Sequence, residues 1–147
     1  MTDYYFDTSA LVKLYHDELN ASVVEEIFSN EENQIFISEI ACIELYSALY
    51  RLRRMNQISE DVLNAAIASF EDDCAYRLAI QVVTSHNVEQ TKAIIRRYGH
   101  NKSIRTLDAI QLSTSLGRTD NLVFVCADTL LSELAQNEKL KVLDLSR

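Results

Sequence analysis

Short apolar runs alternate with longer amphipathic segments along this chain. The first run, Tyr4 to Phe6, ends at Asp7, and Thr8 and Ser9 then offer capping oxygens to a helical pattern from Ala10 through Tyr15. A strand that leads directly into a helix is the beginning of a βα unit. The pattern therefore predicts alternating strands and helices from the amino-terminal end onward.

The remaining elements follow from the same periodicities. Further strands are expected at residues 34–37, 75–83, 122–127 and 141–145, and further helices at 23–28, 39–55, 59–73, 87–98 and 128–138, with one more that is capped by Ser103 or Thr106 and runs to Leu116. The two glycines, Gly99 and Gly117, each follow a helical segment. Both are expected to end their helices in the left-handed conformation that glycine adopts easily.

Strands separated by helices indicate a parallel sheet that is covered by helices on both faces. The run 122–127 is apolar throughout, so this strand is expected inside the sheet with both faces buried. Ligand sites of such sheets lie at the carboxyl ends of the strands. At 147 residues with no linker, the chain is expected to form a single domain over residues 1–147.

Four carboxylates occupy positions where a charge is costly. Asp7 and Asp128 each close a short apolar run, and Glu44 and Asp108 each lie on the apolar side of a helix. Each has a structural alternative. Asp7 and Asp128 can cap helices, and Glu44 can pair with Arg51. Asp108 can lie in the first turn of a helix, where the helix dipole stabilises a negative charge. A shared site for Mg²⁺ or Mn²⁺ explains all four at once, because hard cations prefer clustered oxygen ligands.

The charge distribution bears on possible partners. A net charge of −8 argues against nucleic-acid binding driven by overall charge. Residues 90–107, however, contain no acid but carry a basic cluster: Lys92, Arg96, Arg97, Lys102 and Arg105. A second basic cluster, Arg51, Arg53 and Arg54, ends another helix. Solvated faces with cations near helix C-termini are the alternative interpretation of both clusters.

Composition also limits the compartment. Three widely spaced cysteines match no zinc pattern and indicate reduced core residues in a cytoplasmic protein. No segment approaches the roughly 20 apolar residues of a membrane span, and the start lacks the features of a secretory signal, so no membrane association is expected. The helix at 39–55 carries Tyr46 and Tyr50 beyond its buried stripe, and it is expected to pack against a second chain or a partner helix.

Four segments resemble the PIN-domain family, specifically the VapC-like toxins of bacterial type II toxin–antitoxin systems: YFDTSALVKLY, SEIACIELYSALYR, RTLDAIQLSTSL and VFVCADTLLSELA. The likeness spans the whole chain in order and spacing. It implies a three-layer α/β/α sandwich with a central five-stranded parallel sheet and an Mg²⁺- or Mn²⁺-dependent endoribonuclease activity. It also implies homodimerisation and inhibition by a cognate antitoxin. Family members often carry Ser or Thr two residues before the last acid, where this chain has Cys126.

The resemblance places the acidic, catalytic site on Asp7, Glu44, Asp108 and Asp128. On this hypothesis Asp7, Asp108 and Asp128 hold one metal ion, and Glu44, itself a candidate ligand, orients or deprotonates the attacking water. Candidate contacts to the RNA substrate are two hydroxyls and four cations: Thr8, Ser9, Arg96, Arg97, Lys102 and Arg105.

Two non-catalytic alternatives stay open. A receiver-type regulatory domain also places an acidic Mg²⁺ pocket on a parallel sheet, but it usually has paired acids after its first strand and a lysine after its last. Here Asp7 stands alone and Lys141 opens its strand. A PIN-like scaffold that binds RNA or a partner without cutting is the second alternative, and the full set of four acids argues against it.

Overall fold

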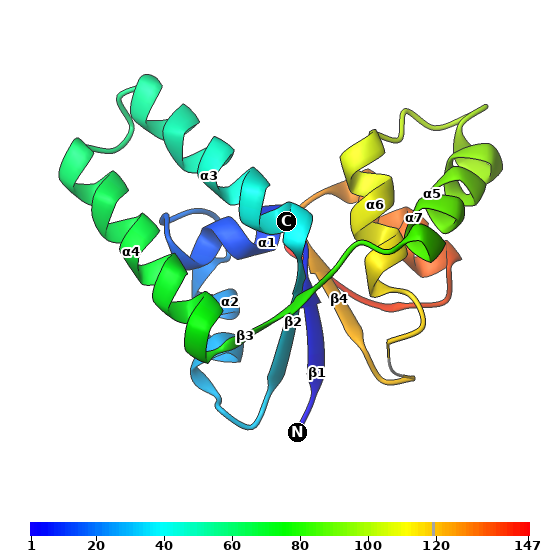
Figure 1. Cartoon of the computed structure of the whole chain (residues 1–147), viewed down its shortest axis with the longest axis horizontal. Helices are drawn as coiled ribbons and strands as arrows, with labels where there is room; N and C mark the ends of the chain where they lie inside the picture. Colours follow the sequence, from blue (N-terminus) through cyan, green and yellow to red (C-terminus); the bar gives the residue numbers. More distant parts are fainter. Residues whose placement is uncertain (119) are drawn as a thin grey trace.

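The computed structural model describes residues 1–118 and 120–147, and it shows a sheet with helices packed on both sides (Figure 1). The strands are β1 (Asp3–Phe6), β2 (Gln34–Ser38), β3 (Leu78–Gln81), β4 (Val123–Cys126) and β5 (Lys141–Asp144). Their order across the sheet is β3-β2-β1-β4-β5, and each neighbouring pair is parallel. The predicted α/β/α sandwich with a central five-stranded parallel sheet is confirmed.

The helices in the first half of the chain cover one face of the sheet, and those in the second half cover the other face. They are α1 (Thr8–Leu11), the 3-10 turn η1 (Val12–Leu14), α2 (Ala21–Ser29), α3 (Glu39–Arg54), α4 (Glu60–Tyr76), α5 (Ser85–Tyr98), α6 (Thr106–Ser115) and α7 (Thr129–Asn137). One buried core contains Leu11, Val24 and Leu45 under α1 to α4. A separate core contains Ile94, Leu112 and Leu134 under α5 to α7. Figure 1 shows the two helical layers on either side of the sheet.

The central strand β1 supplies both cores, because successive side chains of a strand point to opposite faces. Phe6 is buried in the core under α1 to α4. Tyr5 is buried in the other core, where its ring stacks on Phe124 with centroids 5.5 Å apart. Strand β4 lies inside the sheet between β1 and β5, as predicted, and Phe124 through Cys126 are fully buried. The residues that follow β1 and β4 therefore emerge side by side at one edge.

Two local predictions are wrong, and a third is confirmed. The predicted strand 75–83 is shorter, because the hydrogen-bonded turn of α4 continues to Arg77, whose N–H donates to the Asp73 carbonyl over 2.8 Å. Gly99 is right-handed, with φ −64°, and the reason for glycine is space, since a Cβ would lie 2.5 Å from the Ile95 carbonyl oxygen. Gly117, with φ 73°, has the predicted left-handed conformation.

The start of α6 also differs from the prediction. Its N-cap is Arg105, which makes no side-chain capping hydrogen bond, so neither Ser103 nor Thr106 caps this helix. The partner of α3 is α4 of the same chain: the Tyr46 hydroxyl donates to Glu71 over 2.8 Å. Among the described residues, no helix has both the length and the apolar character needed to cross a bilayer.

Candidate active site

All four predicted carboxylates line one cavity of about 320 Å³ at the carboxyl end of the sheet. Asp7 follows β1 and Asp128 follows β4, while Glu44 comes from α3 and Asp108 from the first turn of α6. The other residues that line the cavity are Thr8, Ser9, Val12, Ala48, Arg51, Arg105 and Gln111. The structure thus brings together acids that are separated by up to 121 positions in the sequence.

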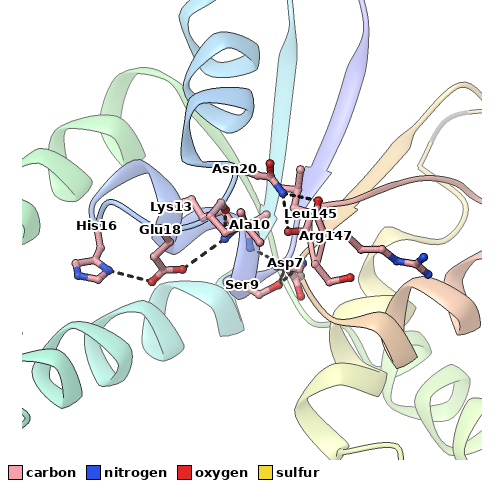
Figure 2. Close-up of polar contacts among 12 residues, drawn as sticks. Asp7, Ser9, Ala10, Lys13, His16, Glu18, Asn20, Leu145 and Arg147 are labelled. Carbon is pink, nitrogen blue, oxygen red and sulfur yellow. Dashed lines mark hydrogen bonds and ion pairs between the residues drawn. The ribbon is translucent and has the colours of Figure 1, made fainter.

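Asp7 is the most enclosed of the four, with only 4 % of its surface exposed. Its Oδ1 accepts from the Ser9 hydroxyl at 2.7 Å and from the Ala10 N–H at 2.9 Å, so it also caps α1 (Figure 2). Burial raises the pKa of Asp7 to about 7, and the negative charges of Asp108 and Asp128 add to this rise. The capping role occupies one oxygen, and Oδ2 has no hydrogen-bond partner among the described residues.

Asp128 divides its oxygens in the same way. Its Oδ1 caps α7 by accepting from the Leu131 N–H over 2.8 Å. The Cys126 thiol does not support this carboxylate: it lies 3.0 Å from the Ser132 hydroxyl and 3.6 Å from the Asp128 backbone oxygen. Burial raises the pKa of Cys126 to about 12, so this thiol stays neutral.

Asp108 is half-buried and makes no hydrogen bond or ion pair with a described residue. Burial raises its pKa, as does repulsion from Asp128 and Glu44, and the positive charge of Arg105 opposes the rise. Its place in the first turn of α6 also suits the helix dipole. Both carboxylate oxygens of Asp108 are therefore available to a ligand.

Glu44 is held from two sides. Its Oε1 accepts from the Thr8 hydroxyl at 2.8 Å and from the amide nitrogen of Gln111 at 3.1 Å. The alternative of an ion pair with Arg51 is not seen among the described residues. All fully buried side-chain nitrogens and oxygens in that part of the chain have a partner. Glu44 Oε2 has no such partner, so it is not fully buried, and Glu44 lines the cavity.

Gln111 and Arg51 line the cavity although neither was predicted as a site residue. Gln111 is 1 % exposed and lies three positions after Asp108, which places both on one side of α6. That spacing was the available signal in the sequence. Arg51 lies seven positions after Glu44, two turns along α3, and shares its side of the helix.

The hydroxyls proposed to contact substrate are used within the chain. Ser9 Oγ donates to Asp7 and accepts from the Ala127 N–H at 2.8 Å, while Thr8 Oγ1 donates to Glu44 and accepts from Gln111 at 3.0 Å. These bonds orient the two acids and connect α1 with α3, α6 and the end of β4.

A buried lysine lies near the site but outside the cavity (Figure 2). Lys13, which is 4 % exposed, donates to the Leu19 carbonyl at 2.6 Å and pairs with Glu18 at 3.5 Å. His16 Nδ1 lies 3.0 Å from the same carboxylate. The charge of Lys13 is therefore already balanced by Glu18, and its two contacts hold the segment between η1 and α2 in place.

The four predicted substrate cations lie in different surroundings. Arg105 lines the cavity, whereas Arg97 pairs with Glu138 and Lys102 pairs with Glu133 at 3.0 Å. Arg96 lies on α5 and lines a separate surface pocket with Lys92. Of the four, only Arg105 reaches the acidic cavity.

Carboxylate oxygens are the kind of ligand that a hard divalent cation binds. Asp7, Asp108 and Asp128 each keep an oxygen without a described partner, and such oxygens are the ligands that Mg²⁺ and Mn²⁺ prefer. In the described part of the chain, no three His, Cys, Asp or Glu side chains lie close enough together to coordinate one ion directly. Mg²⁺ commonly keeps several waters and uses one or two carboxylates directly, so binding here would be partly through water.

Comparisons with solved structures find the same fold over the whole chain. DNA-bound VapBC from Salmonella typhimurium aligns with a TM-score of 0.71 at 16 % identity, covering 99 % of each chain. FitAcB from Neisseria gonorrhoeae gives 0.66 at 18 % identity, covering 98 % of this chain and 99 % of that one. VapC20 from Mycobacterium tuberculosis, a sarcin–ricin loop cleaving toxin, gives 0.66 at 16 % identity, covering 88 % and 93 %.

At these identities the structural likeness establishes the fold alone. No curated protein matches the chain significantly. The sequence model of the PIN domain, however, matches residues 4–137, which include all four carboxylates. This chain belongs to the PIN domain family.

Proposed function

We propose that this protein is a divalent-metal-dependent endoribonuclease and the toxin of a toxin–antitoxin pair. The observation that carries the proposal is the convergence of Asp7, Glu44, Asp108 and Asp128 on one cavity of a PIN domain. Each of the three aspartates keeps an open oxygen there, although that arrangement costs electrostatic energy. A cation would remove this cost.

The acids have separate roles in the proposed reaction. Asp7, Asp108 and Asp128 hold the cation, directly or through water. A bound Mg²⁺ or Mn²⁺ would relieve charge on the phosphoryl oxygens and favour ionisation of the attacking water. Glu44 orients that water or accepts its proton through Oε2, because Oε1 is occupied by Thr8 and Gln111. Attack by water predicts products with a 5′-phosphate and a 3′-hydroxyl.

Two arginines at the cavity are the proposed contacts to the RNA backbone. Arg51 and Arg105 line the acidic cavity from α3 and from the start of α6, and neither makes an ion pair with a described residue. Their guanidinium groups are suited to phosphate oxygens. They offset the repulsion between an acidic pocket and a polyanion. Arg96, Arg97 and Lys102 lie farther along the proposed path.

The partners proposed for this chain follow from its family and from its structural likeness to VapBC complexes. They are an antitoxin protein that inhibits the nuclease and a second copy of the chain in a homodimer. The proposed location is the cytoplasm, where both RNA and antitoxin are available. Co-expression with the product of a small neighbouring reading frame, followed by co-purification, tests the antitoxin.

The test of the enzyme is cleavage of structured RNAs by purified protein with Mg²⁺, with Mn²⁺ and with EDTA. RNAs that carry a sarcin–ricin loop belong in this panel. Cleavage that EDTA abolishes and that Asp7→Asn and Asp128→Asn eliminate is the expected result. Analysis of the product ends then checks the chemistry, and a 2′,3′-cyclic phosphate would contradict attack by water.

The non-catalytic alternatives predict a different result from the same assay. A scaffold that only binds RNA would shift RNA in a gel without cutting it, equally with either metal. A regulatory domain would bind Mg²⁺ without binding RNA. Metal-dependent cutting by wild type but not by Asp108→Asn separates the nuclease from both.

A further inference from the structure

A chain of buried hydrogen bonds connects the core under α5 to α7 with the acidic cavity. Tyr5, which is fully buried, donates its hydroxyl to Gln111 Oε1 over 2.8 Å, and Thr114 lies on the other side of that hydroxyl. The Gln111 amide nitrogen then contacts Thr8 Oγ1 at 3.0 Å and Glu44 Oε1 at 3.1 Å. A primary amide has two N–H donors, so both are used.

The partners of Gln111 fix which way its amide points. If the group were reversed, its oxygen would face Glu44 Oε1, and two acceptors would lie 3.1 Å apart. In the observed orientation Tyr5 donates to the oxygen while the nitrogen faces the carboxylate. Because the Glu44 carboxylate can only accept, the amide cannot turn without losing its hydrogen bond to Oε1.

We propose that Gln111 is a positioning residue for Glu44. Its amide nitrogen, together with the Thr8 hydroxyl, saturates Glu44 Oε1 and leaves Oε2 as the atom that meets the attacking water. This inference rests on the proposed nuclease function. Gln111 itself is 1 % exposed, and the oxygen and nitrogen of its amide are occupied by partners within the chain. Its effect on the reaction therefore passes through the carboxylate.

Kinetics of Gln111→Leu, a change that keeps the volume and removes the donors, provide the main test. A misplaced Glu44 affects the attack and not RNA binding, so kcat should fall about 10-fold or more while KM stays within about threefold. Gln111→Glu keeps the acceptor for Tyr5 but replaces the donors with an oxygen, and it should give the same split. If either folded variant has the same kcat as wild type, the proposal is overturned.

A double-mutant cycle with Glu44→Gln separates positioning from general damage. If Gln111 acts through Glu44, the double variant should be no slower than the slower single variant. Multiplicative losses would mean that Gln111 acts elsewhere. The matched control is Gln90→Leu. Gln90 lies on α5 outside the cavity, and its side chain accepts a hydrogen bond from Ser113, which is on α6 like Gln111. The kcat of this control should stay within about twofold of wild type.

A readout that needs no catalysis distinguishes failure of this inference from failure of the proposed function. If wild type cleaves no RNA, the function fails, and the contact is still tested by the side-chain amide resonances of Gln111 in ¹⁵N NMR. These protons should exchange at least about tenfold more slowly than those of exposed Gln side chains. Glu44→Ala should remove much of that protection. Unchanged exchange in Glu44→Ala would refute the hydrogen bond on which the proposal depends.

Discussion

The Ser9 hydroxyl donates to Asp7 Oδ1 over 2.7 Å, and the hydroxyl oxygen of Ser9 accepts from the backbone N–H of Ala127 over 2.8 Å. Ala127 directly precedes Asp128 in the loop that leaves β4. One side chain thus joins the ends of two neighbouring parallel strands and fixes the separation of two candidate metal ligands. A single hydroxyl supports both the fold at this edge and the shape of the cavity.

Ser9→Ala should therefore weaken both stability and metal binding. The substitution leaves the Ala127 N–H without its acceptor and removes a donor from Asp7, and such losses cost about 1–3 kcal/mol. Urea denaturation measures the loss of unfolding free energy, and titration with Mn²⁺ measures the affinity. Ser29→Ala is the control, since Ser29 is exposed and bonds only within α2. Equal unfolding free energies for Ser9→Ala and wild type would refute the role given to this hydroxyl.

Stability without metal should depend on pH through Asp7. Its pKa is about 7 in the folded chain and 3.8 ordinarily, so between these values the folded state holds a proton that the unfolded state has lost. The free energy of unfolding should therefore fall as pH rises from about 4 to about 7, by up to about 4 kcal/mol, and then level off. The raised pKa of Asp108 adds a change in the same direction.

Asp7→Asn should remove most of this pH dependence and should be more stable than wild type at pH values above about 7 in EDTA. Urea denaturation across this pH range provides the measurement. The same slope in the two proteins would show that Asp7 is not the group that titrates.

Addition of Mn²⁺ should reverse the order of stability. An ion that binds only the folded chain raises its unfolding free energy by about 2.7 kcal/mol at a hundred times its Kd. Wild type should gain this stability, while Asp7→Asn and Asp128→Asn should gain much less. Asp61→Asn, an exposed change on α4, should behave as wild type. An equal melting shift in all four proteins would count against the aspartates as ligands.

The positions of Asp7 and Asp128 could be predicted because each follows a short apolar run, and parallel strands end at one edge. Their structural and functional interpretations are compatible: Oδ1 caps a helix, while Oδ2 has no partner among the described residues and both aspartates line the cavity. The end of α4 was harder to predict. The aromatic Tyr76 in its last turn and the β-branched Ile80 in β3 lie four positions apart, so residue types typical of strands continue across the boundary and periodicity does not separate the two elements.

Gln111 could not be identified in the same way. An uncharged amide on an amphipathic helix has no cost that marks it in a sequence, and its role depends on where Tyr5 and Glu44 come to lie. The basic cluster was ambiguous for a similar reason. Arg97 and Lys102 pair with Glu138, just after α7, and Glu133, within α7, and only the folded structure shows these pairs.

That difference in pairing leads to a prediction about RNA binding. Arg51 and Arg105 make no ion pair with a described residue and line the cavity, so each can neutralise a backbone phosphate. Arg51→Ala and Arg105→Ala should each weaken RNA binding and reduce the slope of log K against log salt by about 0.7 to 1. Fluorescence anisotropy in EDTA, over a range of KCl concentrations, measures both quantities without cleavage.

Arg97→Ala and Lys102→Ala are the matched controls. Each would have to leave an existing carboxylate partner before it could bind a phosphate, so the net gain from RNA is small. Their salt slopes should stay near that of wild type. If the controls reduce the slope and the cavity arginines do not, the RNA path crosses α5 and α7 instead of the acidic cavity. Cleavage would then require a different route for the strand to reach Glu44.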